Sequence, residues 1–302
     1  MINEKTYFQP SINIRHDFGR VFLYDRYLPT PSHVDSTLGV LKGVLEQGNH
    51  AHIIVGPYGS GKSLLGTIIA GILSNDLNTR DFQSLSKKFQ TVNDQIHELL
   101  QTLKKKKSRY IPVILNGNDS NFKRLLLTAL YTTLRKYKLN FTQSIIVDDI
   151  LKIVDTWEKK YRPTYDEFLR FLEAQTWTID TWRKDIENVN VTAIDWFKKM
   201  YPLLTSGAQL TLSFDKDLIS QLDYITKELK KQNLGLFIIH DEFGRFLQTL
   251  PSAAIHETMQ DLQDLAEFSN SGDENGLHVL LITHRNLGQY ALRYNEDMQK
   301  EF

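Results

Sequence analysis

Residues 52–63 read HIIVGPYGSGKS, and this stretch decides the fold. Its opening residues, 52–55, form an apolar run typical of a buried strand, and a glycine-rich turn follows at once. Apolar residues then continue from Ser63 to about Leu73 in a pattern typical of a helix. The sequence therefore predicts a strand, a tight turn and a helix in direct succession.

The turn between strand and helix carries a phosphate-binding pattern. Residues 56–63 fit G-x-x-x-x-G-K-[ST] at every fixed position. Glycines let the backbone turn tightly, so that its N–H groups face phosphate oxygens, and the following helix adds the positive end of its dipole. Lys62 is expected to reach the β- and γ-phosphates, and the Ser63 hydroxyl is expected to bind Mg²⁺.

A chance match is the alternative reading of this loop, but the expected strand and helix flank it on both sides. ATP is the expected substrate and Mg²⁺ the expected cofactor, although the pattern does not separate ATP from GTP. The predicted nucleotide-binding residues are Gly56, Pro57, Tyr58, Gly59, Ser60, Gly61, Lys62, Ser63 and Leu64, of which Lys62 is also expected to act in catalysis.

Two adjacent carboxylates follow a second apolar strand, residues 236–239. Asp241 is expected to hold Mg²⁺, directly or through a water, and Glu242 to polarise and orient an attacking water. An acidic pair after a strand is also common as a helix cap. Together with the phosphate loop, the pair indicates a hydrolase site, so residues 236–242 are interpreted as a Walker B segment.

Polar residues also follow the strand predicted at 277–282, within the segment 277–286. They are Thr283, His284 and Arg285, and their spacing does not choose among them. A polar loop after a core strand is the alternative. Asn116 and Asn118, after a strand at 111–115, either line the same crevice or form a turn. Arg245 is read as an arginine finger, a partner for acidic groups or a plain surface residue.

Apolar strands that alternate with helices predict an α/β fold, a three-layer sandwich with a parallel sheet covered on both faces. Residues 1–140 are expected to form an N-terminal segment and the first part of the nucleotide domain, and 231–302 its second part. Residues 141–230 are predicted to be a helical insertion, because they show helical periodicity, few strand signals and all the tryptophans, which are interpreted as core anchors.

Two expectations concern the ends of the chain. Residues 1–34 are predicted to be irregular, before a helix capped by Asp35 or Ser36. The helical run at 287–302 ends without a capping glycine, which is compatible with a chain that continues.

The composition narrows the classes of partner. Lys+Arg and Asp+Glu both number 36, so the net charge of +0 gives no support for DNA, although a local basic groove is compatible with it. The chain has no cysteine and no signal-peptide pattern in residues 1–10, which favours the cytoplasm. Its apolar runs are too short to span a membrane, and its histidines show no zinc-ligand spacing.

These segments together resemble the additional-strand, catalytic-glutamate class of P-loop NTPases, near the AAA+ and STAND groups. Within that class, the stretches 49–63, 112–118, 240–247 and 283–286 resemble the nucleotide domain of large bacterial anti-phage ATPases such as the BREX-type P-loop proteins. The class implies that the strand before Thr283 lies between the two Walker strands and ends in a group that senses the γ-phosphate. A lid domain and a second sensor arginine are not found in the sequence.

The resemblance implies an ATPase that couples hydrolysis to action on a partner, with a role in anti-phage defence. It also implies that a second copy or a protein partner supplies an arginine finger. The alternative is a STAND-like switch with slow turnover, in which Arg285 of the Thr-x-Arg pattern is the sensor. A phosphotransferase fits less well, because the acidic pair suits attack by water, and an ABC-type head would require a Ser-Gly-Gly signature that this chain lacks.

Overall fold

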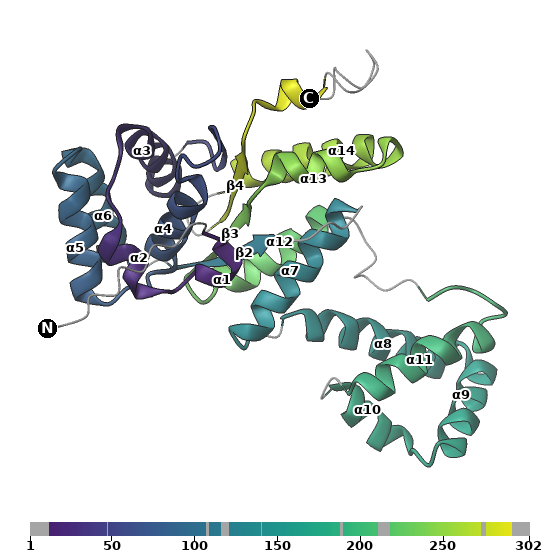
Figure 1. Cartoon of the computed structure of the whole chain (residues 1–302). Coiled ribbons are helices and arrows are strands. Elements are labelled where there is room, and N and C mark those ends of the chain that lie inside the picture. The colour runs from purple at the N-terminus through teal and green to yellow at the C-terminus, as the bar shows by residue number, and fades with distance from the viewer. Residues whose placement is uncertain are drawn as a thin grey trace, which may run out of the picture. The chain divides into compact units, whose positions relative to one another are not determined.

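The computed structural model describes residues 12–46, 48–106, 109–115, 121–139, 141–187, 190–210, 218–272 and 276–291. The chain divides into two compact units, shown in Figure 1. Unit 1 comprises Met1–Thr133 and Thr226–Phe302, and unit 2 comprises Leu134–Ile225.

Unit 1 is built around one parallel sheet, which confirms the predicted α/β class. Its strands are β1 (Ala51–Val55), β2 (Arg109–Leu115), β3 (Leu234–His240) and β4 (Leu277–Thr283), in the order β1-β4-β3-β2. Val55 pairs with Thr283, and His240 pairs with Leu281. The carboxyl ends of these strands therefore lie along one edge of the sheet.

Helices make up most of the other described residues of unit 1. They are α1 (Ile14–Asp17), α2 (Val21–Arg26), α3 (Pro31–Leu45), α4 (Lys62–Ser74), α5 (Thr79–Gln90), α6 (Asp94–Lys106), α13 (Phe243–Thr249), α14 (Ser252–Asn270) and α15 (Leu287–Ala291). Two further helices, α7 (Phe122–Lys136) and α12 (Leu218–Lys230), belong partly to each unit. Across the described ranges, no helix combines the length and the apolar character that a membrane span requires.

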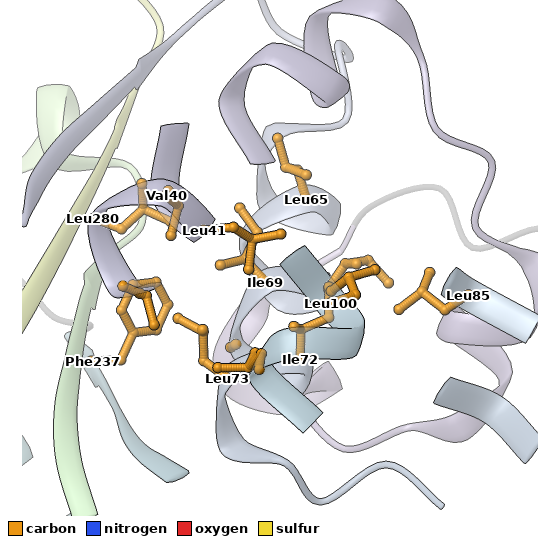
Figure 2. Close-up of a cluster of buried hydrophobic side chains, with 14 of the residues drawn as sticks. Val40, Leu41, Leu65, Ile69, Ile72, Leu73, Leu85, Leu100, Phe237 and Leu280 are labelled. Atoms are coloured by element: carbon orange, nitrogen blue, oxygen red, sulfur yellow. The ribbon is translucent and has the colours of Figure 1, made fainter. Parts of the chain in front are cut away.

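The sheet is packed on both faces. On one face, buried side chains of α3, α4, α5 and α6 form a core with Phe237 of β3 and Leu280 of β4 (Figure 2). Because side chains alternate along a strand, Val279 and Leu281 face the other way. There they line a cavity of about 340 Å³ together with Met259 of α14. This packing holds the ends of β1, β4 and β3 in fixed register beside α4.

The N-terminal region differs from its prediction. Residues 1–34 were expected to be irregular, but α1 and α2 lie within them. The next helix, α3, begins at Pro31 with Thr30 as its cap, so the caps predicted at Asp35 and Ser36 are wrong. The Thr30 side chain accepts a hydrogen bond from the first turn, and proline suits that turn because it lacks an N–H that would stay unpaired.

Unit 2 is helical in its described parts. It contains α8 (Phe141–Lys160), α9 (Arg162–Ala174), α10 (Ile179–Glu187) and α11 (Val191–Leu204). Trp157 and Trp182 are buried in its core, and Trp177 and Trp196 pack against that core, which confirms the tryptophans as core anchors. The compact unit begins and ends a few residues before the insertion predicted at 141–230.

Candidate functional site

The loop with the phosphate-binding pattern connects β1 to α4. Gly59 and Gly61 have φ angles of 75° and 82°, in the left-handed region that favours glycine. Gly61 is the cap of α4, so the unpaired N–H groups of that helix open beside the loop. Of the other predicted residues, Pro57, Tyr58 and Ser60 are exposed, and Leu64 packs against the core.

Lys62 is folded back over this loop. Its side chain is buried, with 7% of the residue exposed, and Nζ donates to the carbonyl oxygens of Gly56 and Pro57 at 2.6 Å each. Burial lowers the pKa of the Lys62 ammonium, and the nearby Asp241 carboxylate opposes that shift. A positive charge is thus held in a partly desolvated position, where an anion would find few competing water molecules.

Ser63 joins the loop to the end of β3. Its hydroxyl donates to Asp241 Oδ1 at 3.1 Å, across 178 residues of sequence. Burial raises the pKa of the Asp241 carboxyl, whereas the bonds from the Ser63 hydroxyl and the Glu242 N–H lower it. The two residues predicted to bind Mg²⁺ are therefore in direct contact.

Their oxygen atoms fit a magnesium ion. Neighbouring ligands of an octahedral Mg²⁺ lie about 2.9 Å apart, since each is about 2.0–2.1 Å from the metal. The observed 3.1 Å between Ser63 and Asp241 is close to that spacing. Within the described ranges, no group of three or more histidines, cysteines or carboxylates is arranged to hold a metal. Mg²⁺ usually keeps several waters and takes few protein ligands.

Glu242 lies next to Asp241 in an unusual backbone conformation. Its φ angle is 53°, a left-handed value that is rare for a residue with a side chain, and it occupies the N-cap position of α13 without a capping hydrogen bond from its side chain. The exposed carboxylate contacts the Arg245 guanidinium at 3.3 Å. Such strain concentrates at functional sites. Of the roles expected for Arg245, the contact shown is that of a partner for an acidic group.

The three candidates at the end of β4 occupy different positions: Thr283 is the last residue of the strand, and His284 and Arg285 follow it. Thr283 is fully buried, and its hydroxyl bonds to the backbone of Arg285, whose N–H donates to it at 3.1 Å. Arg285 is exposed. His284 instead reaches the loop, with Nδ1 at 3.4 Å from Lys62 Nζ and its ring stacked on that of Tyr58.

The electrostatic environment of His284 is compatible with its contact with Lys62. Burial, followed by the positive charge of Lys62, lowers the pKa of its imidazole. A neutral ring presents Nδ1 as an acceptor for the ammonium. Of the three candidates, His284 is thus the one that contacts Lys62. Asn116 and Asn118 lie outside the described residues.

One contact of the loop was missed by sequence reasoning. His33, in the first turn of α3, lies with Nε2 at 3.0 Å from the carbonyl oxygen of Ser60. No sequence pattern marks this residue, because it precedes Ser60 by 27 residues and lies in α3, whereas Ser60 lies in the loop before α4.

Comparison with protein-family models, with curated proteins and with solved structures gives no match to this chain. The functional assignment therefore depends on the geometry of the site.

Proposed function

We propose that the chain is a P-loop NTPase domain that binds ATP with Mg²⁺ and hydrolyses it. The observation that carries the proposal is the contact between the Ser63 hydroxyl and the Asp241 carboxylate. Two patterns that were recognised separately in the sequence meet there, at a spacing suited to one metal ion. A glycine-rich loop that matched the pattern by chance would not be expected to contact the carboxylate of the second pattern.

The strand order supports the same proposal. β4 lies between β1, which leads into the phosphate loop, and β3, which ends at Asp241. This is the arrangement that the resemblance to the additional-strand class of P-loop NTPases implies. We therefore propose that unit 1 is a P-loop NTPase sandwich and that the helical unit 2 is inserted into it.

In the proposed mechanism, the loop and Lys62 bind the phosphates. Backbone N–H groups of the loop and of the first turn of α4 donate to phosphate oxygens, while Lys62 exchanges its bonds to the Gly56 and Pro57 carbonyls for bonds to the β- and γ-phosphates. Mg²⁺ held by Ser63 and Asp241 would neutralise charge on the phosphates. His284, in contact with Lys62, is placed to respond to the γ-phosphate.

Glu242 is proposed to act on the attacking water. Its carboxylate is exposed, and its paired guanidinium is exposed too, so the ion pair is weak and easily exchanged. The carboxylate would accept a proton from the water and orient it for in-line attack.

The test is steady-state hydrolysis of MgATP and MgGTP by the wild type and by Glu242→Gln. The variant is expected to keep nucleotide affinity and to lose about two orders of magnitude in kcat. Glutamine keeps the size and shape of the side chain, but it cannot accept a proton from the attacking water. Glu257→Gln, which changes an exposed carboxylate on α14, is the matched control and is expected to match the wild type.

Two results would contradict the proposal. One is a wild type that binds neither nucleotide by calorimetry, and the other is a Glu242→Gln variant that turns over at the wild-type rate.

A slow nucleotide switch is the second candidate function. It is favoured by the contact between Glu242 and Arg245, because a carboxylate that stays paired with a guanidinium would accept a proton from water less readily. In that case nucleotide would stay bound through purification, and Arg245→Ala would accelerate single-turnover hydrolysis. An ATPase that couples hydrolysis to action on a partner would instead turn over repeatedly, and faster when that partner is present.

Coupling to a partner, and a role in anti-phage defence, are proposals drawn from the resemblance alone. Stimulation of hydrolysis by DNA would support them, although the balanced charge gives no expectation of it. A second copy that donates an arginine would make the rate rise with protein concentration.

A further inference from the structure

His33 is held by hydrogen bonds at both nitrogens of its ring. Nε2 lies 3.0 Å from the carbonyl oxygen of Ser60, and Nδ1 lies 3.1 Å from the Tyr27 hydroxyl. The residue is 7% exposed and Tyr27 is 1% exposed. The first turn of α3, capped by Thr30, sets the position of His33.

The chemistry of the partners defines the direction of both bonds. A carbonyl oxygen only accepts, so Nε2 carries the hydrogen and donates to Ser60. In a neutral ring, Nδ1 then accepts from the Tyr27 hydroxyl. Burial raises the pKa of the Tyr27 phenol, which keeps that donor protonated. Tyr27 also packs on Phe89 of α5, so the pair is anchored in the core of unit 1.

This arrangement orients one peptide group of the loop. The peptide that joins Ser60 to Gly61 is planar and trans, so its C=O and N–H point in opposite directions. Holding the carbonyl against His33 turns the Gly61 N–H away from His33. A Cβ on Gly61 would lie 3.0 Å from the imidazole, a tight contact, and the φ angle of 82° also favours glycine there.

We propose that Tyr27 and His33 form a positioning pair that aims the Gly61 N–H at the phosphates of a bound nucleotide. The inference rests on the proposed function. It assigns part of the affinity of the loop for phosphate to two residues that lie outside the loop. The pair acts through the backbone and does not touch the reacting atoms. It therefore affects binding of the phosphate chain more than the chemical step.

The experiment measures KM and kcat for MgATP, and the Kd of inorganic tripolyphosphate, for four variants and one control variant. His33→Ala removes the donor and is expected to raise both KM and Kd about three- to tenfold, the effect of one hydrogen bond, while kcat stays within about twofold. His33→Gln places an amide N–H close to the position of Nε2 and is expected to restore most of the affinity. His33→Asn, with a shorter side chain, is expected to behave like alanine.

Tyr27→Phe tests the outer member of the pair. It keeps the ring that packs on Phe89 but removes the hydroxyl, so a loss of about twofold is expected. His97→Ala, at a histidine of α6 that bonds to Ser86, is the control and is expected to match the wild type. Circular dichroism of each variant without nucleotide verifies the fold. If His33→Ala does not fold, the comparison of His33→Gln with His33→Asn replaces it.

Two outcomes would overturn the inference while leaving the proposed function intact. In one, the wild type binds MgATP and folded His33→Ala binds it equally well. In the other, glutamine and asparagine at position 33 lose affinity equally, which indicates a packing role. A wild type that binds neither nucleotide nor tripolyphosphate overturns the proposed function, and the inference with it.

Discussion

Hydrogen bonding distinguishes the proposed site, at the carboxyl end of the parallel sheet, from a pair of buried histidines at its amino end. At the carboxyl end, Lys62 and Asp241 each have hydrogen-bond partners within the site. At the amino end, the rings of His50 and His278 lie 4.4 Å apart beside a cavity of about 670 Å³. His50 bonds to Ser269, but His278 Nδ1 has no hydrogen-bond partner among the described residues.

Hydrogen bonds at the carboxyl end are compatible with the binding of a ligand, whereas an unpaired buried imidazole at the amino end costs free energy of folding. Bonds to carbonyls and hydroxyls at the carboxyl end can be exchanged for bonds to a ligand. At the amino end, burial lowers the pKa of the His278 imidazole, as it does for His240 at the end of β3, so acid is expected to destabilise the fold. Each of the following measurements tests whether the two ends are independent in this way.

The largest expected effect concerns acid and His278. Burial, together with nearby His50 and His52, lowers the pKa of His278 to about 3, below the ordinary value of about 6.5. Between these values the unfolded chain binds the proton more readily, so stability rises with pH and is lost on acidification from about pH 6.5 toward pH 3. At pH 4 the loss from this residue is on the order of 3 kcal/mol.

Urea unfolding between pH 4 and pH 7 measures this loss. The variant His278→Leu is expected to lose less stability over that range than the wild type and to bind MgATP with unchanged affinity at pH 7. An identical pH dependence in the two proteins would mean that His278 is not the source of the acid sensitivity. Weakened nucleotide binding would show that the two ends are coupled.

The next largest effect is expected at Lys62. Lys62→Ala should lower MgATP affinity about a hundredfold or more, because the ammonium makes charge-assisted bonds to phosphate. Stability should be unchanged or higher, since burial disfavours the charged form of Lys62 in the folded state. Calorimetry and urea unfolding measure the two quantities. Lys87→Ala, at an exposed lysine of α5, is the control, and unchanged affinity in Lys62→Ala would refute the site.

A smaller effect is expected at Ser63. Ser63→Ala removes one proposed ligand of Mg²⁺ and should raise the Mg²⁺ concentration required for half-maximal hydrolysis about tenfold, a loss typical of one polar contact. Ser63→Thr keeps a hydroxyl and is expected to stay near the wild type. If alanine and threonine behave alike, the serine is not a ligand.

The smallest effect is expected at Tyr58. Its ring stacks on His284 but is 78% exposed, so Tyr58→Ala should change KM about two- to threefold and leave stability nearly unchanged. Tyr58→Phe keeps the stack and serves as the control. An effect as large as that of Lys62→Ala would mean that Tyr58 binds the nucleotide directly.

Features encoded in short stretches were predictable. The strand, turn and helix around residues 52–73 appear as β1, the loop and α4, because apolar spacing and glycine act locally. The parallel sheet followed from strands that alternate with helices. The tryptophan core of unit 2 followed from helical periodicity and large apolar side chains.

Contacts between distant segments were not predictable. The bond between Lys62 and His284 spans 222 residues, and spacing alone left Thr283 and Arg285 equally plausible. The cap of α3 was misplaced because Asp35 and Ser36 are good caps in isolation, whereas Thr30 followed by Pro31 forms the actual start. His33 was missed because its partner is a backbone carbonyl, which no side-chain pattern reveals.

The backbone at Glu242 has a consequence for protein engineering. A search for stabilising changes would choose this position early, because glycine adopts a positive φ without the roughly 1–2 kcal/mol that other residues lose there. Substitution by glycine would remove the carboxylate that is proposed to accept a proton from the attacking water. A screen that scored heat resistance alone would therefore favour a variant without the proposed base.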